Sequence, residues 1–215
     1  MSTLSLPAVQ SLLLEDIDWK TYTRLLRAFA ERRSLRLTYD CGSLEIMTLT
    51  HEHESYAHLL GRFVVVLTEE FGLPIKGGGS TTFRRRKRRK GLEADESYWI
   101  ANEPLVRGKD RIDLRIDPPP DLALEIDVTH SSLDRLAIYA ALRVPEVWRR
   151  EGESVVCYLL GQHGNFAVSP TSRAFPGLAP ADLVQFLALR TQMDENALIR
   201  RFRAWVQQQF QRPRP

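Results

Sequence analysis

The chain has 215 residues, of which 43% are hydrophobic and 27% are charged, a composition that excludes disorder of the whole and fits one folded domain. Its longest clear apolar run, residues 63–67, is far shorter than the ~18 residues that a membrane span needs, and the first residues lack the basic start of a signal peptide. The two cysteines, Cys41 and Cys157, are too few for a disulfide framework or a thiolate zinc site. We therefore expect a cytoplasmic protein with no membrane association, one domain over residues 1–215, and frayed ends near residues 1–15 and 211–215.

The net charge of +3 comes from one short segment. Seven consecutive basic residues stand at positions 84–90, and without them the net charge would be −4. The pI of about 9.0 therefore describes this segment and not a uniformly basic surface. A local cation cluster on a mildly acidic body is typical of a surface that meets a polyanion.

The first half of the chain predicts two helices around a β-hairpin. Asp18 precedes apolar residues at helical spacing, which predicts a capped helix that ends near Ser34. Two alternating segments, 35–39 and 44–47, are joined by turn-forming residues and predict the hairpin. Residues 51–71 return to helical periodicity, and the glycine and proline that follow end this helix.

The second half predicts strands, a crossover helix and a helical C-terminus. We expect strands at residues 80–84, 95–100, 121–128, 144–149, 155–160 and 166–168. Ser131 or Ser132 is expected to cap a helix that runs through Leu142, and further helices are expected at residues 180–189 and 194–210. A strand, a helix and a strand in succession indicate an α/β fold with a mixed β-sheet core flanked by helices. The apolar stripe around Trp205 fits either the core or a homodimer face.

The strand expected at residues 121–128 carries two acids on an otherwise apolar segment. Side chains alternate between the two faces of a strand, so Glu125 and Asp127 share one face while the aliphatic residues share the other. Buried carboxylates must be paired, protonated or bound to a metal, and two adjacent ones repel unless a cation lies between them. The pattern indicates either an acidic site or an edge strand whose second face is wet.

Further carboxylates come from two other predicted elements. Glu93 and Asp95 precede the aromatic segment 98–100, and Glu54 lies in the first turn of the helix that begins at His51. Acids from a helix and two strands can converge and hold Mg²⁺, which takes oxygen ligands and suits phosphodiester hydrolysis. A glutamate in a first helical turn is also favoured by the helix dipole alone, so Glu54 has two interpretations.

Several other residues near these acids fit less specific roles. Asp121 and Glu125 would be ~13 Å apart along one strand at ~3.3 Å per residue, too far to share one Mg²⁺. His130 follows the acidic strand and could reach the site or remain inert. Three histidines form no zinc motif, and we expect them to cap the helix or face solvent: His51, His53 and His58. Three large aromatic residues are expected in the core: Trp99, Tyr139 and Trp148.

Five short motifs in a fixed order resemble a known family. They are Met47–Glu54 (MTLTHEHE), Ser80–Phe83 (STTF), Gly91–Tyr98 (GLEADESY), Pro119–Asp127 (PPDLALEID) and Tyr139–Trp148 (YAALRVPEVW). In this order they resemble the Uma-type restriction endonuclease family of the PD-(D/E)XK nuclease superfamily, over roughly residues 19–205. The resemblance implies a restriction-endonuclease-like fold and Mg²⁺-dependent hydrolysis of DNA phosphodiester bonds, with Mn²⁺ as a possible substitute.

The resemblance also implies roles for individual residues. Asp95 matches the acid of the "PD" motif, and Glu125 matches the first acid of "(D/E)XK", so these two would hold the metal. Glu54 matches the acid that the first core helix contributes. Ala94 stands where the proline is usual, a position that supplies geometry and no ligand.

A second departure from the family pattern concerns the cation. Asp127 stands where the superfamily has lysine, and Arg135 occupies the place in the following helix from which the cation comes in this family. The pKa of an arginine is too high for a general base. Water deprotonation would thus rest on the metal or on Asp127, while Arg135 stabilises the charge of the phosphorane. The alternative is an inactive nuclease.

The basic segment is the part of the sequence best suited to DNA. Its residues lie between two predicted strands, where a hairpin tip or loop would present them to phosphates: Arg84, Arg85, Arg86, Lys87, Arg88, Arg89 and Lys90. A solvated loop without a ligand is the alternative. We expect duplex DNA as the partner and a homodimer, because cleavage of a duplex needs two active sites. A catalytically inactive DNA-binding or interaction module is the competing function.

Overall fold

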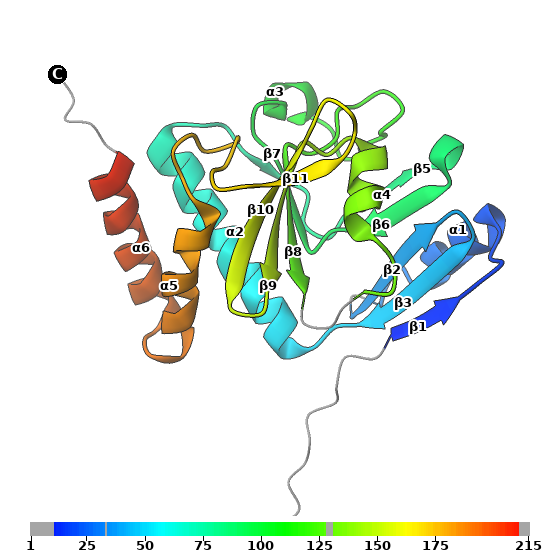
Figure 1. The fold of residues 1–215 in the computed structure, drawn as a ribbon, viewed down its shortest axis with the longest axis horizontal. Helices are drawn as coiled ribbons and strands as arrows, with labels where there is room; N and C mark the ends of the chain where they lie inside the picture. The colour runs from blue at the N-terminus through cyan, green and yellow to red at the C-terminus, as the bar shows by residue number, and fades with distance from the viewer. Residues whose placement is uncertain (1–10, 33, 128–130, 211–215) are drawn as a thin grey trace, which may run out of the picture.

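Two β-sheets form the framework of the protein (Figure 1). The computed structural model describes residues 11–32, 34–127 and 131–210. The first sheet has the strand order β1-β3-β2-β6-β5: β1 (Ser11–Leu14), β2 (Leu35–Asp40), β3 (Ser43–Thr48), β5 (Thr82–Arg85) and β6 (Lys90–Glu93). The second has the order β11-β10-β9-β8-β7-β4: β4 (Lys76–Gly77), β7 (Glu96–Trp99), β8 (Leu122–Asp127), β9 (Glu146–Glu151), β10 (Ser154–Leu160) and β11 (Phe166–Ser169).

Helices cover both faces of the second sheet. The α-helices of the described residues are α1 (Trp19–Ala28), α2 (His51–Phe71), α3 (Glu103–Val106), α4 (Arg135–Leu142), α5 (Val184–Leu187) and α6 (Glu195–Phe210). Short 3₁₀ helices add η1 (Arg86–Arg88), η2 (Pro180–Leu183) and η3 (Ala188–Thr191). Helices α2, α5 and α6 share one apolar core with the sheet, whereas α4 packs in a second core on the other face, toward the β5–β6 hairpin (Figure 1).

The centre of the second sheet is a crossover unit, as the sequence predicts. Strand β8 pairs with β9 in parallel, and helix α4 connects the two strands. Strand β8 also pairs with β7 in antiparallel, so the sheet is mixed. The predicted α/β fold with a mixed sheet is therefore confirmed. Leu122, Leu124 and Ile126 of β8 pack into the core that contains α2. Because β8 has neighbours on both sides, the edge-strand interpretation of its acids is wrong.

Local capping sets the ends of the long helix α2. The side chain of Thr50 accepts a hydrogen bond from the backbone N–H of His53 at 3.2 Å, which satisfies one of the free donors of the first turn. Gly72 ends the helix in the left-handed conformation, with φ of 65°. The predicted helix over residues 51–71 is confirmed. Among the described residues, no helix is long and apolar enough to cross a membrane.

The structure corrects three expectations about element ends. Residues 11–14, expected in a frayed end, form β1 and pair with β3. The first helix ends at Ala28, earlier than the expected end near Ser34. Helix α4 begins at Arg135, and its cap is Asp134, whose side chain accepts from Ala137 N–H at 3.0 Å, so the expected caps Ser131 and Ser132 are wrong. Val128, the expected last residue of the β8 strand, lies outside the described residues.

The C-terminal stripe belongs largely to the core. Trp205 is half-buried and lies 5.3 Å from Phe186 and 5.8 Å from Phe202, measured between ring centroids. Phe202 in turn lies 4.4 Å from Phe63 of α2. These contacts join α5 and α6 to α2, so the core interpretation of this stripe holds.

Candidate active site

Two buried carboxylates on neighbouring strands form the centre of the candidate site. Asp95 directly precedes β7 and Glu125 lies in β8, and the antiparallel pairing of Glu96 with Leu124 brings them close. The Asp95 carboxylate accepts a hydrogen bond from Ile126 N–H at 2.8 Å. Asp95 is 7% exposed and Glu125 is 6% exposed, so both acids are largely withdrawn from water.

Arg135 holds Glu125 through two parallel hydrogen bonds. Its Nε and Nη2 atoms donate to the two carboxylate oxygens at 2.7 Å each, and the Tyr139 hydroxyl donates to the same carboxylate. Arg135 also donates to Thr38 Oγ1 at 2.6 Å and to the Glu93 carbonyl at 2.7 Å. Burial raises the pKa of Glu125, whereas the charge of Arg135 acts to lower it. The bidentate guanidinium keeps a buried carboxylate in place and in a defined orientation.

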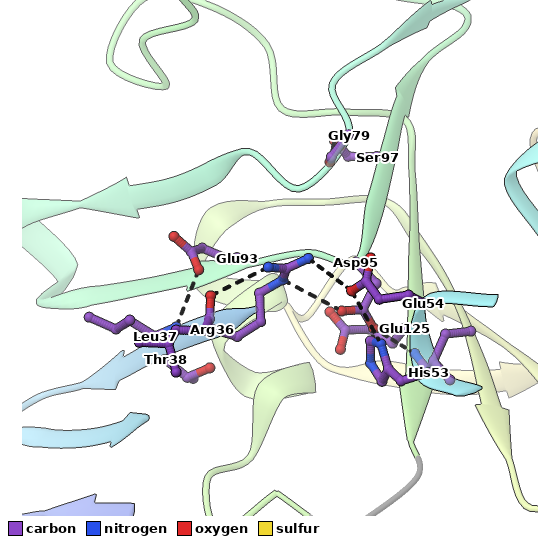
Figure 2. Close-up of polar contacts among 12 residues, drawn as sticks. Arg36, Leu37, Thr38, His53, Glu54, Gly79, Glu93, Asp95, Ser97 and Glu125 are labelled. Atoms are coloured by element: carbon purple, nitrogen blue, oxygen red, sulfur yellow. Dashed lines mark hydrogen bonds and ion pairs between the residues drawn. The ribbon is translucent and has the colours of Figure 1, made fainter. Parts of the chain in front are cut away.

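His53 and Arg36 are the cations beside Asp95 (Figure 2). His53 Nε2 lies 3.2 Å from Asp95 Oδ2, and Arg36 Nε lies 3.9 Å from Asp95 Oδ1. Burial acts to raise the pKa of Asp95, but the hydrogen bond and the charge of His53 outweigh it and hold that pKa below the usual value. Burial acts to lower the pKa of His53, but its contacts with Asp95 and Glu54 raise that pKa to about 9. His53 is therefore a buried cation, and the expected capping or solvent role of its side chain is wrong.

Glu54 lies at the open edge of this group. Its carboxylate is about half exposed, with Oε1 at 3.5 Å from Arg36 Nη2 and at 3.8 Å from His53 Nδ1 (Figure 2). The contact with His53 lowers the pKa of Glu54 more than its partial burial raises it. The first turn of α2 thus brings Glu54 next to the same cations that contact Asp95.

Asp127 ends β8 on the same face as Glu125. Its carboxylate forms an ion pair with Arg149 Nη2 from the parallel neighbour β9. Arg149 Nε also lies 3.5 Å from Glu151. The position that holds lysine in the superfamily pattern is therefore an acid paired to an arginine from the next strand.

One small cavity unites these residues. It is lined by Arg36, Met47, Leu49, His53, Asp95, Glu125, Ile126, Asp127, Ser131, Arg135 and Arg149. Three acids and four cations therefore face a confined space, with Glu54 beside them. Such a mixture can bind an anionic phosphate on its cations and a divalent cation on its acids.

The oxygen ligands in the cavity suit Mg²⁺, but the described side chains around them are not arranged to hold a metal ion. Asp95 and Glu125 offer hard carboxylate oxygens, and Mg²⁺ often takes one or two such ligands and keeps several waters. In the described residues, however, no three His, Cys, Asp or Glu side chains are grouped to hold a metal ion. Arg135 holds both oxygens of Glu125, so a divalent cation would have to share or displace these contacts.

The basic segment forms a hairpin, as predicted. Its first two residues end β5, residues 86–88 form η1, and Lys90 begins β6, where it pairs with Asp40. The side chains of Arg84 and of residues 86–89 are exposed. Arg89 takes the left-handed conformation, with φ of 49°, and closes the turn.

The histidines and Asp121 lie in different surroundings. His58 Nε2 contacts Glu195 at 3.1 Å on the surface, and His51 is exposed. His130 lies outside the described residues.

Asp121 accepts hydrogen bonds from the backbone N–H groups of Ile100 and Asn102, at 2.7 and 2.9 Å. It therefore caps a loop and does not line the cavity.

The sequence analysis did not identify Arg36 and Thr38 as site residues, although the pattern of their strand contains a signal for them. Arg36 and Thr38 alternate with the buried Leu37 and Tyr39 on β2, which places both polar side chains on one face. This alternation could have identified Arg36 as a site residue. No local signal joins His53 to Asp95. Tyr139 is in the core as expected, although its hydroxyl reaches Glu125.

The fold and the site together define a class of protein. Acids on two adjacent central strands of a mixed sheet, with helices on both faces, are consistent with a restriction-endonuclease-like protein. A model of the family described as "Putative restriction endonuclease" (Uma2) matches residues 19–192. The chain belongs to this family, whose general placement is the PD-(D/E)XK superfamily. No curated protein matches the chain.

Proposed function

We propose that this protein is a divalent-metal-dependent endonuclease that hydrolyses phosphodiester bonds of duplex DNA. The observation that carries the proposal is the pair of buried carboxylates, Asp95 and Glu125, on adjacent strands at a cavity that four cationic side chains also line. Buried acids with shifted pKa values that face a cavity are typical of functional sites. Family membership supports a nuclease as that function.

Asp95 and Glu125 are the residues that would hold Mg²⁺ or Mn²⁺. The ion would supply a Lewis acid and lower the pKa of bound water. Glu54 supports the site from α2, and Asp127 is the candidate acceptor for a proton of the attacking water. Arg36 faces the cavity beside Asp95, where a guanidinium can bind a phosphate oxygen. The described contacts of Arg135 are all with protein acceptors, so we assign it the role of holding and orienting Glu125 and no direct contact with the phosphorane.

Conversion of supercoiled plasmid to nicked or linear forms tests the proposal. We expect cleavage with Mg²⁺ or Mn²⁺, none with EDTA, and a loss of roughly 100-fold or more in Asp95→Asn and Glu125→Gln, because a metal ligand supports several kcal/mol of transition-state stabilisation. Asp182→Asn is the matched control, since Asp182 is an exposed acid away from the cavity. Equal activity in all four proteins would point to a contaminating nuclease and contradict the proposal. Thermal melting of each variant separates loss of activity from loss of fold.

A catalytically inactive DNA-binding module is the second candidate. It is favoured by the contacts of Arg135 with both oxygens of Glu125 and by the acid at position 127. If the native protein binds duplex DNA in a salt-dependent manner, never cleaves it, and retains its affinity in Asp95→Asn, this second function is correct.

We propose further that the protein acts as a homodimer, since two sites are needed to cut both strands of a duplex. Sedimentation equilibrium with and without duplex DNA measures this directly. A monomer under both conditions would limit the enzyme to nicking.

A further inference from the structure

A groove runs along the outer face of α4, away from the candidate active site. The inner face of α4 carries Arg135 and Tyr139 to Glu125, whereas Ala137 and Ala140 line the groove. The opposite wall is the turn between β10 and β11, residues 160–166. The groove encloses about 950 Å³, which leaves room for an extended ligand. Its α4 wall is mostly apolar, with Leu136 and three alanines between Asp134 at one end and Arg143 at the other.

Three arginines gather at one end of this groove, and we call them the arginine cluster: Arg85, Arg88 and Arg143. Arg88 and Arg143 line the groove, and Arg85 comes from the adjacent strand β5. Burial lowers the pKa of Arg85, and the positive charges of Arg143 and Arg88 lower it further. Arg85 Nε is buried and has no hydrogen-bond partner in the described part of the chain. Like charges held together around an unsatisfied donor are costly unless an anion joins them.

Arg143 stands at a position where glycine is the usual residue. It ends α4 in the left-handed conformation, with φ of 66°, which costs free energy for a residue with a Cβ. A cation is favoured at a helix C-terminus, which offsets part of this cost. Arg143 lines the groove together with Arg88, which lies between β5 and β6. Arg143 thus occupies an unfavourable backbone conformation close to Arg85 and Arg88.

We propose that the arginine cluster binds a phosphodiester group of the DNA backbone, and that the bound strand continues along the groove beside α4. The inference rests on the proposed function and adds Arg143, from a different element, to the predicted basic segment. The eight residues of α4 span ~12 Å at ~1.5 Å per residue. That length corresponds to about three to four nucleotides at ~3.4 Å each. A strand held at the cluster can therefore extend toward the α4 end that carries Arg135.

The test measures binding of the full chain to a fluorescent DNA duplex by anisotropy, in EDTA and over a series of salt concentrations. Arg143→Gly removes the guanidinium while it supplies the residue that the left-handed conformation favours, so the fold is retained or stabilised. Arg143→Lys keeps the charge. Arg200→Ala is the matched control, because it removes one exposed arginine from α6, away from the groove.

We expect Arg143→Gly to weaken binding several-fold and to reduce the slope of log K against log salt by about 0.9, the effect of one lost phosphate contact. Arg143→Lys should retain most of the slope, and Arg200→Ala should match the native protein. If Arg143→Gly binds like Arg200→Ala while Arg86→Gln weakens binding, the groove contact is wrong and the DNA-binding proposal survives. If the native protein shows no salt-dependent binding, the proposed function fails and the inference fails with it.

Discussion

Arg135 is the residue on which the candidate site depends most. Its guanidinium links Glu125 of β8 with Thr38 of β2 and the Glu93 carbonyl of β6, so a single side chain joins both sheets and α4. Removing one partner of a buried ion pair leaves an uncompensated charge, which costs more than the pair contributes.

We predict that Arg135→Met lowers the free energy of unfolding by about 3–5 kcal/mol. Arg135→Met combined with Glu125→Gln should be less destabilised than the single variant, because no carboxylate is left unpaired. Urea unfolding of the two single variants and the double variant measures this coupling. Strict additivity of the two changes would show that the pair is not energetically coupled.

His53 and Asp95 give the fold a pH dependence of defined sign. The pKa of His53 is about 9 in the folded protein and 6.5 for the free side chain, so its stabilising effect is complete below pH 6.5 and is lost as the pH rises through about 9. The pKa of Asp95 is lowered from 3.8, so its effect is present above pH 3.8 and is lost in acid below that value.

We predict that the native protein loses roughly 3 kcal/mol more stability than His53→Gln between neutral pH and about pH 10. Denaturant unfolding in EDTA at a series of pH values measures the difference. Other groups that titrate in this range are the same in both proteins and cancel. Parallel curves for the two proteins would contradict the ion pair between His53 and Asp95.

At the scale of elements, short contacts decide where α4 begins. Asp134 accepts from Ala137 N–H at 3.0 Å, whereas Ser131 Oγ and the Ser132 backbone N–H both donate to Glu45 of β3. Glu45 is 1% exposed, so it ties the start of this segment to the first sheet. Asp134 thus caps α4, whereas Ser131 and Ser132 attach the preceding segment to β3.

We predict that Asp134→Ala costs about 1 kcal/mol of stability, the value of an N-cap. Ser132→Ala is the matched control and should change stability by less than ~0.5 kcal/mol, because its contact with Glu45 comes from the backbone. Thermal or urea unfolding separates the two variants. The reverse order would restore Ser132 as the cap of this helix.

In the whole molecule, the net positive charge is concentrated in the hairpin formed by β5, η1 and β6. The basic hairpin holds seven cations, while the remainder of the chain is net negative. Clustered charge attracts a polyanion more strongly than the same charge dispersed over the surface.

We predict that neutralising the hairpin tip, with Arg86, Lys87 and Arg88 each changed to Gln, lowers the salt slope of duplex binding by up to about 2.7, or ~0.9 for each phosphate contact. The control changes Arg24, Arg200 and Arg201 to Gln, three exposed residues outside the hairpin, and alters the net charge equally. Equal loss in both proteins would mean that overall charge and not the hairpin attracts DNA.

Elements with local signals could be predicted from the sequence. The long helix α2 begins after Thr50 and ends at Gly72 because a cap and a left-handed residue act within a few positions. The shared face of Glu125 and Asp127 follows from the two-residue period of a strand. The resemblance of the motifs to a known family further indicated that Asp95 and Glu125 act together, and it indicated the family itself. These features need no knowledge of distant contacts.

The cationic partners of the buried acids could not be predicted from the sequence, because the fold brings them together from distant positions. Arg135 and Thr38 are 97 residues apart in sequence, and His53 meets Asp95 across 42, so no periodicity or spacing joins them. The same holds for Arg143, which the fold brings to Arg85 and Arg88 of the basic segment beside the groove. A buried charge needs an oppositely charged or hydrogen-bonding partner. The packing of both sheets against α2 and α4 determines which side chains come close enough to be that partner. Local sequence therefore determined which residues carry charge, and the packed fold decided which of them meet.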